Sequence, residues 1–162
     1  AARSRGHADW SEYQDECWAN KTVPGTHGMQ PRILHMCQRL GLNPHNLPAS
    51  NVVFVRSRRE ADLQAEKSAL LNLCWPVHQA VIDALGIKVV VCMGNTCGQW
   101  VRERTGANLC VDKFVENNAR RWQSHLHRSP TNLMVATLTH PSIAAWNSDD
   151  ADPIGLVERA LQ

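Results

Sequence analysis

The sequence predicts an α/β fold with three layers, in which helices cover both faces of a mainly parallel central sheet. Runs of mainly apolar, β-forming residues occur at 52–55, 87–93 and 133–138, as expected for strands that are buried on both faces. Segments with helical spacing of apolar residues separate these runs, and strands that alternate with helices usually pair in parallel. With 162 residues, 43% of them hydrophobic, the chain is expected to form a single domain over 1–162.

The first part of the chain is predicted to hold a lead-in, a helix and a strand. Residues 1–23 are expected to be an irregular or helical lead-in. Apolar residues at helical spacing over 33–40 predict a helix that ends at Gly41, because glycine readily adopts the left-handed conformation that closes a helix. The strand 52–55 follows, with Asn51 at its start.

The middle of the chain predicts a long helix, the clearest strand and a further helix. Helical periodicity extends from about 58 to 85, with a break or kink expected at 75–76, because proline lacks the amide hydrogen that a helix interior uses. The strand 87–93 then turns at 94–96 into a helix that holds Trp100. This order of strand, glycine turn and helix is typical of α/β proteins.

The last part of the chain predicts two strands and a final helix. A weaker strand is expected near 107–111, followed by a basic, amphipathic segment around 120–121. The apolar composition of the strand 133–138 predicts that it is buried. Three aspartates and Pro153 precede the last apolar face, and acidic residues and proline both favour the amino end of a helix.

Composition and charge restrict the location and the partners. The formal net charge is +2 and the pI is about 8.3, which permits contact with nucleic acid without requiring it. No apolar run reaches the roughly 20 residues of a membrane span, and residues 1–6 are polar and basic with no signal-peptide core behind them. We therefore expect an intracellular, cytoplasmic monomer without membrane contact.

The six cysteines are predicted to be reduced and mostly buried. They are scattered along the sequence, and no pair has the two-residue gap of a zinc knuckle or a redox dithiol. A metal site at His125 and His127 is an alternative, but two alternating histidines without further ligand spacing are usually just exposed. The sequence therefore predicts neither a metal nor a cofactor.

Candidate functional residues lie where the predicted strands end, because α/β proteins build their sites in the loops beyond these ends. His140 directly follows a buried strand and precedes a proline with few backbone options, which suits a hydrogen-bond donor or an acid/base group. Asn51 offers the amide donor and carbonyl acceptor that reading a pyrimidine edge requires. The alternatives are purely structural roles: a histidine that caps the loop and an asparagine in a turn.

Four short motifs follow one another in a familiar order. They are the helix end 40–42 with the strand start 50–53, the segment 73–77, the strand and glycine turn 88–96, and the His-Pro-Ser sequence 140–142. In this order and spacing they resemble the uracil-DNA glycosylase superfamily, over about four-fifths of the chain from Pro24 onward. The resemblance implies that the protein excises uracil or a related damaged base from DNA.

The resemblance also implies roles for individual residues. Asn51 would hydrogen-bond the flipped base. His140 would donate to uracil O2 while the glycosidic bond breaks, which stabilises the charge that develops on the leaving base. Ser142 would bind a DNA phosphate together with neighbouring backbone amides.

Four further residues complete the DNA surface that the resemblance implies. Pro141 belongs to the same loop as the serine, and Gly94 and Asn95 belong to the glycine turn after the strand 87–93. Arg56, at the end of the strand 52–55, could add non-specific attraction for the DNA backbone, although a solvated surface role is the simpler interpretation.

The sequence departs from the superfamily pattern in several places. The first motif, a strand followed by Gly and Pro with the residue that positions the attacking water, does not precede Pro24. Val23 stands where an aromatic residue would stack on the base. Ala144 stands at the position of the wedge that fills the gap of a flipped base, so Trp146 is the alternative intercalating side chain. Because only Cys74 matches a ligand of the iron-sulfur branch, no cluster is expected.

These departures leave two other classes of function open. A divergent member could keep the fold and bind nucleic acid or a partner without excising a base. An unrelated thiol-dependent enzyme could use Cys97, near the amino end of a helix, where the helix dipole would lower the pKa of the thiol.

Overall fold

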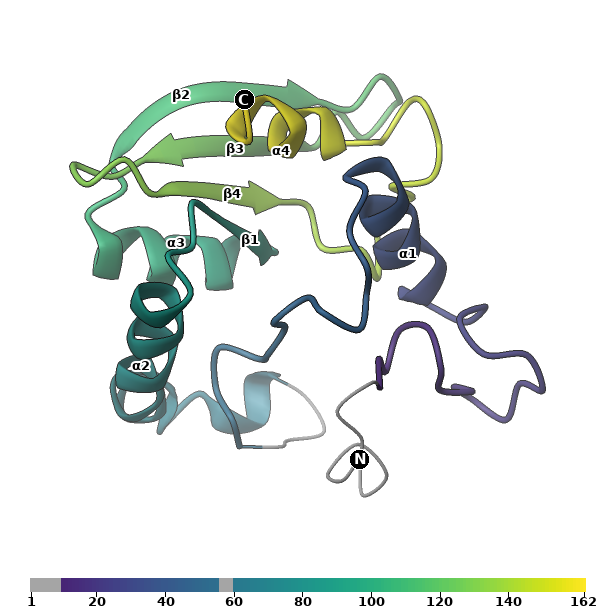
Figure 1. Cartoon of the computed structure of the whole chain (residues 1–162), viewed down its shortest axis with the longest axis horizontal. Coiled ribbons are helices and arrows are strands. Elements are labelled where there is room, and N and C mark those ends of the chain that lie inside the picture. The colour runs from purple at the N-terminus through teal and green to yellow at the C-terminus, as the bar shows by residue number, and fades with distance from the viewer. Residues whose placement is uncertain (1–9, 56–59) are drawn as a thin grey trace. The chain divides into compact units, whose positions relative to one another are not determined.

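The structure is a computed structural model that describes residues 10–55 and 60–162 (Figure 1). The chain divides into two compact units, which are treated separately below. The first comprises the described residues up to Leu47 together with Val89–Gln162, and the second comprises those of Pro48–Lys88. In the described part of the chain, no helix combines the length and the apolar character that crossing a membrane would require.

The first unit contains a four-stranded mixed sheet. Its strands, in spatial order, are β1 (Val89–Met93), β4 (Met134–Leu138), β3 (Gln123–Arg128) and β2 (Leu109–Val115) (Figure 1). Strands β1 and β4 are parallel, whereas β4 with β3 and β3 with β2 are antiparallel. The α/β class is thus confirmed, but the described sheet is mixed where we predicted a mainly parallel one. The reason is that the short connections 116–122 and 129–133 reverse the chain, and tight connections of this kind join antiparallel strands.

The main core of this unit lies between one face of the sheet and two helices, α1 (Gln30–Arg39) and α4 (Ile154–Ala160). Both helices were predicted, and each buries the apolar face that its spacing indicated. The fully or almost fully buried core side chains are Ile33, Met36, Cys37, Leu126, Ala136, Leu138, Ala144, Trp146, Ile154, Leu156 and Val157.

Helix α3 (Asn95–Thr105) packs against β1 and β4 through a very close approach. A Cβ atom placed on Gly98 would lie only 2.2 Å from Thr137 Oγ1. The side chain of Thr137 and those of the α1/α4 core leave β4 on opposite faces, since Ala136 and Leu138 alternate with it along the strand. Helices therefore lie on both faces of the β1–β4 pair.

The second unit consists of an irregular segment, a short 3₁₀ helix (η2, Glu60–Leu63) and the long helix α2 (Lys67–Ala84). The predicted strand 52–55 is wrong, because these residues form bends and no strand. Side chains of α2 instead form hydrogen bonds with backbone groups of residues 52–55. His78 Nε2 lies 3.0 Å from the carbonyl of Val52, and the Phe54 amide donates to Cys74 Sγ at 3.5 Å. Backbone groups bound in this way are not available for a sheet ladder.

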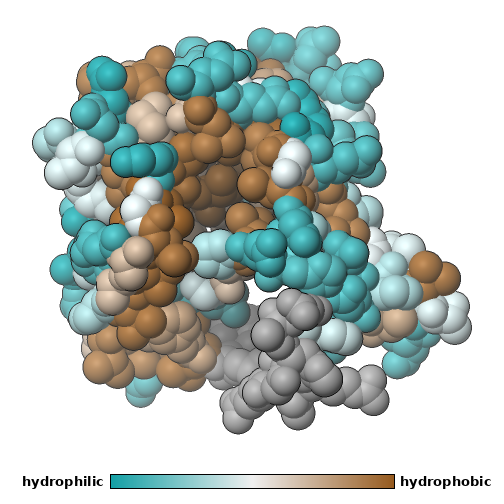
Figure 2. All heavy atoms as spheres, in the orientation of Figure 1, coloured by the Kyte–Doolittle hydropathy of each residue, from teal (hydrophilic) through white to brown (hydrophobic). Residues whose placement is uncertain are grey.

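Helix α2 runs through Pro76 without ending, and it exposes an apolar stripe. Leu73, Val77 and Val81 follow one another at four-residue spacing and are all exposed. Figure 2 shows the corresponding apolar surface over α2, at the lower left of the view.

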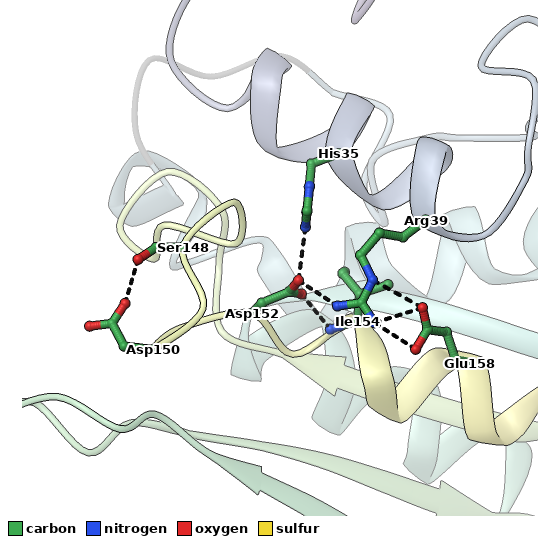
Figure 3. A network of polar contacts seen from close by, with 7 residues as sticks. All are labelled: His35, Arg39, Ser148, Asp150, Asp152, Ile154 and Glu158. Atoms are coloured by element: carbon green, nitrogen blue, oxygen red, sulfur yellow. Dashed lines mark hydrogen bonds and ion pairs between the residues drawn. The ribbon is translucent and has the colours of Figure 1, made fainter.

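Polar contacts join α1 to the segment that leads into α4 (Figure 3). Asp152 accepts hydrogen bonds from His35 Nε2 at 2.8 Å, from Arg39 Nη1 at 2.6 Å and from the amide of Ile154 at 2.9 Å. Arg39 also pairs with Glu158 at 2.6 Å. Burial alone would raise the pKa of Asp152, but the hydrogen bonds from His35, Ile154 and Arg39 outweigh it and hold this pKa below its ordinary value of 3.8.

We predict that Gly98→Ala lowers the free energy of unfolding by about 1–3 kcal/mol, because the added methyl group overlaps Thr137 and forces α3 away from β4. Urea unfolding measures the change. Gly155→Ala in α4 is the matched control, since its Cβ would meet only the side-chain ends of Arg159 and Glu158; it should be neutral or stabilise by up to about 1 kcal/mol. Equal effects of the two substitutions would contradict the close packing described here.

Asp152 should make stability depend on pH in the acid range. Its folded-state pKa lies below the unfolded one, so its contribution is present above the ordinary value of 3.8 and is lost as pH falls through the folded value. We therefore expect Asp152→Asn to be less stable than the wild type near neutral pH and to lose less stability between about pH 5 and pH 3. Urea unfolding at several pH values measures this, with the exposed Asp149→Asn as control. An unchanged pH dependence in Asp152→Asn would count against it.

Candidate functional site

The candidate site forms where β1 and β4 end side by side. Because these strands are parallel neighbours, with Met93 paired to Leu138, the segments that follow them leave the same edge of the sheet. The Gly94 amide donates to the carbonyl of Leu138 at 2.8 Å. The residues after Leu138, 139–144, are called the His140 loop below.

Glycine is required at the turn after β1. Gly94 has a φ of +97°, a backbone conformation that residues other than glycine rarely adopt. A Cβ atom at this position would also lie 3.5 Å from both Cβ and Cδ2 of His140. The turn after β1 therefore lies directly against the histidine.

The His140 loop holds its histidine in one tautomer. The backbone amide of Ser142 donates to His140 Nδ1 at 3.1 Å, and Ser142 Oγ lies 2.7 Å from the same nitrogen. Because a backbone N–H can only donate, Nδ1 is the acceptor, and the neutral ring carries its proton on Nε2. The loop thus presents an imidazole N–H donor at the carboxyl end of β4.

Buried side chains of the first unit fix the start of the His140 loop. The amide of Thr139 donates to Ser124 Oγ at 3.0 Å, and the indole Nε1 of Trp146 donates to the carbonyl of Thr139 at 2.9 Å. Ser124 and Trp146 are both buried. Further along, the amides of Ile143 and Ala144 donate to the carbonyl of His140 and close a tight turn.

Two arginines bind carbonyl groups of the same loop. Arg32 of α1 donates to the carbonyl of Pro141. Arg120, from the connection between β2 and β3, donates to the carbonyl of Ile143 at 2.8 Å. This role could not be predicted for either residue, because both are distant from the loop in sequence and no local pattern marks the contact.

Arg120 is itself held by two neighbours. Its Nη2 atom lies 3.1 Å from Oε2 of Glu116, whose side chain is only 1% exposed. Its guanidinium stacks over the ring of Trp122, 4.3 Å from the ring centroid, a geometry that favours a cation. The loop carbonyl, the buried carboxylate and the aromatic ring therefore position one guanidinium together.

The structure brings together five of the eight predicted site residues. Four of them, Gly94, His140, Pro141 and Ser142, meet at the ends of β1 and β4, and Asn95 follows as the first residue of α3. Asn51 belongs to the second unit, where it is exposed, and Arg56 lies outside the described residues.

The prediction that Trp146 intercalates into DNA is wrong for this conformation. Its side chain is 0% exposed, belongs to the core and uses its indole N–H inside the protein. The small residue Ala144 is equally buried. Ile143, which lies between Ser142 and Ala144, is 55% exposed. Exposure within the loop therefore points to Ile143, which the sequence alone could not distinguish from its neighbours.

The cysteines form no disulfide, and three of the six are buried. Cys92 and Cys97 interact: a hydrogen bond from Cys92 lowers the pKa of Cys97, and the same contact, together with burial, raises that of Cys92. Among the described residues, no group of three or more histidine, cysteine or acidic side chains is arranged to hold a metal ion.

Comparisons with protein family models, with curated proteins and with solved structures found no match for this chain.

We predict that Arg120→Ala lowers the free energy of unfolding by about 2 kcal/mol or more, since it leaves the buried Glu116 carboxylate without its cation. The exposed neighbour Arg121→Ala is the control, with an expected change within about 0.5 kcal/mol. Urea unfolding measures both. Similar losses in the two variants would show that the Glu116–Arg120 contact does not stabilise the fold.

Proposed function

We propose that this protein is a divergent member of the uracil-DNA glycosylase superfamily, which hydrolyses the N-glycosidic bond of uracil or a related damaged base in DNA. The observation that carries the proposal is the His140 loop. Its histidine follows a buried parallel strand, lies against a glycine turn and is held with the ring proton on Nε2. This is the donor that the reaction needs at the departing base.

In the proposed reaction, the bond between uracil N1 and C1′ of the deoxyribose breaks, a water molecule adds to C1′ and loses a proton, and the leaving base carries negative charge that extends to its O2. The Nε2–H of His140 donates a hydrogen bond to this oxygen, and a donor that is already oriented stabilises the charge without reorganisation. The contact of Ser142 with Nδ1 keeps the ring in place. Asn51 stays our prediction for the residue that hydrogen-bonds the edge of the base.

The proposal extends to the architecture. A three-layer arrangement with a mainly parallel sheet is the fold that the resemblance implies. It is supported by the parallel β1–β4 pair, by α3 on one face and by α1 and α4 on the other. In this interpretation β3 and β2 are an antiparallel addition at one side of the sheet.

The DNA would bind along the His140 loop and the start of α3. Ser142, Asn95 and the glycine turn offer hydroxyl, amide and backbone groups for a phosphate. Ile143, exposed at the tip of the loop, is the apolar side chain that we assign as the wedge between base steps. Arg56 remains a predicted contact to the DNA backbone.

A second candidate is a protein of this fold that binds nucleic acid or a partner without excising a base. It is favoured by the complete burial of Trp146, the side chain that the sequence offered as an alternative wedge because Ala144 is too small for this role. The two functions differ in whether a glycosidic bond is broken.

The test is an excision assay on a labelled oligonucleotide with one uracil, followed by alkali to cleave the abasic site. We expect the wild type to produce cleavage, and His140→Ala and Asn51→Ala to reduce its rate by about 10²–10⁴-fold, because each removes a contact to the base. His27→Ala, a histidine in the loop before α1, is the control and should retain activity.

Circular dichroism would establish that each variant is folded. Cleavage that survives both substitutions would contradict the assigned roles. Absence of cleavage by the folded wild type, with retained binding of the oligonucleotide, would favour the second candidate.

A further inference from the structure

A second cationic cluster lies on β2 and β3, apart from the His140 loop. His125 and His127 are two residues apart on β3, so their side chains leave the same face of the sheet. Lys113 of β2 is the register partner of His125. Arg102 of α3 reaches the same face, with Nη1 3.1 Å from Nε2 of His127. These four residues are called the Arg102 face.

The contact between Arg102 and His127 defines the state of the histidine. A guanidinium only donates, so Nε2 of His127 is the acceptor and Nδ1 carries the ring proton. This Nδ1 is buried and has no hydrogen-bond partner among the described residues. A buried donor without a partner costs about 1–3 kcal/mol. The neutral ring of His127 is therefore held at an energetic cost in this conformation.

The Arg102 face has positive charge without a matching carboxylate. His125 is faced by Lys113, Arg102, His127 and Thr137, and His127 by Arg102, His125, Cys110 and Val135. In the part of the chain that the structure describes, no acidic side chain forms an ion pair with Arg102 or Lys113. The face is therefore complementary to an anion.

We propose that the Arg102 face is a second binding site, which takes a phosphate group from the backbone of a nucleic-acid strand. The planar guanidinium of Arg102 and the two imidazoles are donors that suit phosphate oxygens. The choice of a strand over free phosphate rests on the proposed function, whereas the phosphate chemistry rests on the four side chains alone.

Binding at this face takes up a proton. When a phosphate arrives, Arg102 turns from the ring to the anion, and Nε2 of His127 gains a proton from solvent and becomes a donor to the same anion. Burial, then Arg102 and Lys113, lower the pKa of His125, and burial, then Arg102 and His125, lower that of His127. Both rings are thus neutral at pH 7 without ligand, and a bound anion raises their pKa values. Affinity must therefore rise as pH falls.

The experiment measures fluorescence anisotropy of a labelled, uracil-free single strand at about pH 7.5 and about pH 5.5. The double variant Lys113→Gln/His125→Gln removes two accessible donors, and Arg102→Gln removes the guanidinium. Arg128→Gln is the matched control, because it removes one charge from the same strand but from the face opposite to His125 and His127. Circular dichroism checks the folding of all variants.

We expect wild type and Arg128→Gln to bind up to about 100-fold more tightly at the lower pH, because the uptake of one proton changes affinity about tenfold per pH unit and the two conditions are about two units apart. The double variant should lose the part of this increase that His125 contributes, and Arg102→Gln should bind more weakly at both pH values, because it lacks the guanidinium. Equal pH dependence in the double variant and in Arg128→Gln would overturn the proposal. If one variant fails to fold, the other decides.

Histidine-ring NMR with inorganic phosphate separates the two sources of the anion. Shifts of His125 and His127 with the strand, reversed only by a large excess of phosphate, support the strand as ligand. If phosphate shifts these signals and the strand does not displace the phosphate, the assignment of the strand as ligand is overturned. Because the NMR shifts belong to the rings of His125 and His127, they report binding at this face without uracil and without excision. Loss of excision with intact binding at this face would reject only the proposed function.

Discussion

The parallel pairing of β1 with β4 is the constraint on which the rest of the first unit depends. It makes both strands end at one edge of the sheet, and the hydrogen bond from Gly94 to Leu138 joins the two segments that leave it. Antiparallel pairing would have sent these segments to opposite edges. The position of His140 beside the glycine turn is thus a consequence of strand direction, and the close contact of Gly98 with Thr137 holds α3 directly after that turn.

The His140 loop is held by individually modest contacts from several elements. A single hydrogen bond contributes only about 1 kcal/mol net, but Ser124, Trp146, Arg32 and Arg120 each bind a different backbone group of residues 139–143. A loop restrained at successive peptide groups has few alternative conformations, which is what a preoriented donor requires. The buried Glu116 carboxylate is part of this arrangement, because it positions Arg120.

The sequence predicted the elements whose own composition determines them. Apolar runs of β-forming residues predicted β1 and β4, and amphipathic spacing predicted α1 and α4. The glycine turn after a strand predicted α3. Strand β3 was missed because its polar residues, His125 and His127 among them, are not typical of a buried strand. The segment 52–55 has strand composition but is bound by side chains of α2. The burial of Trp146 and the arginine contacts depend on tertiary structure, so no local pattern could reveal them.

The arginine contacts determine when during folding the candidate site can exist. Arg32 and Pro141 are separated by 109 residues, and Arg120 and Ile143 by 23. Contacts between residues so distant in sequence form only after the entropy of closing the intervening chain has been overcome. During synthesis, the His140 loop would leave the ribosome after both arginines, and its final geometry would still await the β2–β3 hairpin and α1. The site is therefore a late product of folding, and a chain trapped before this step would have secondary structure but no ordered histidine.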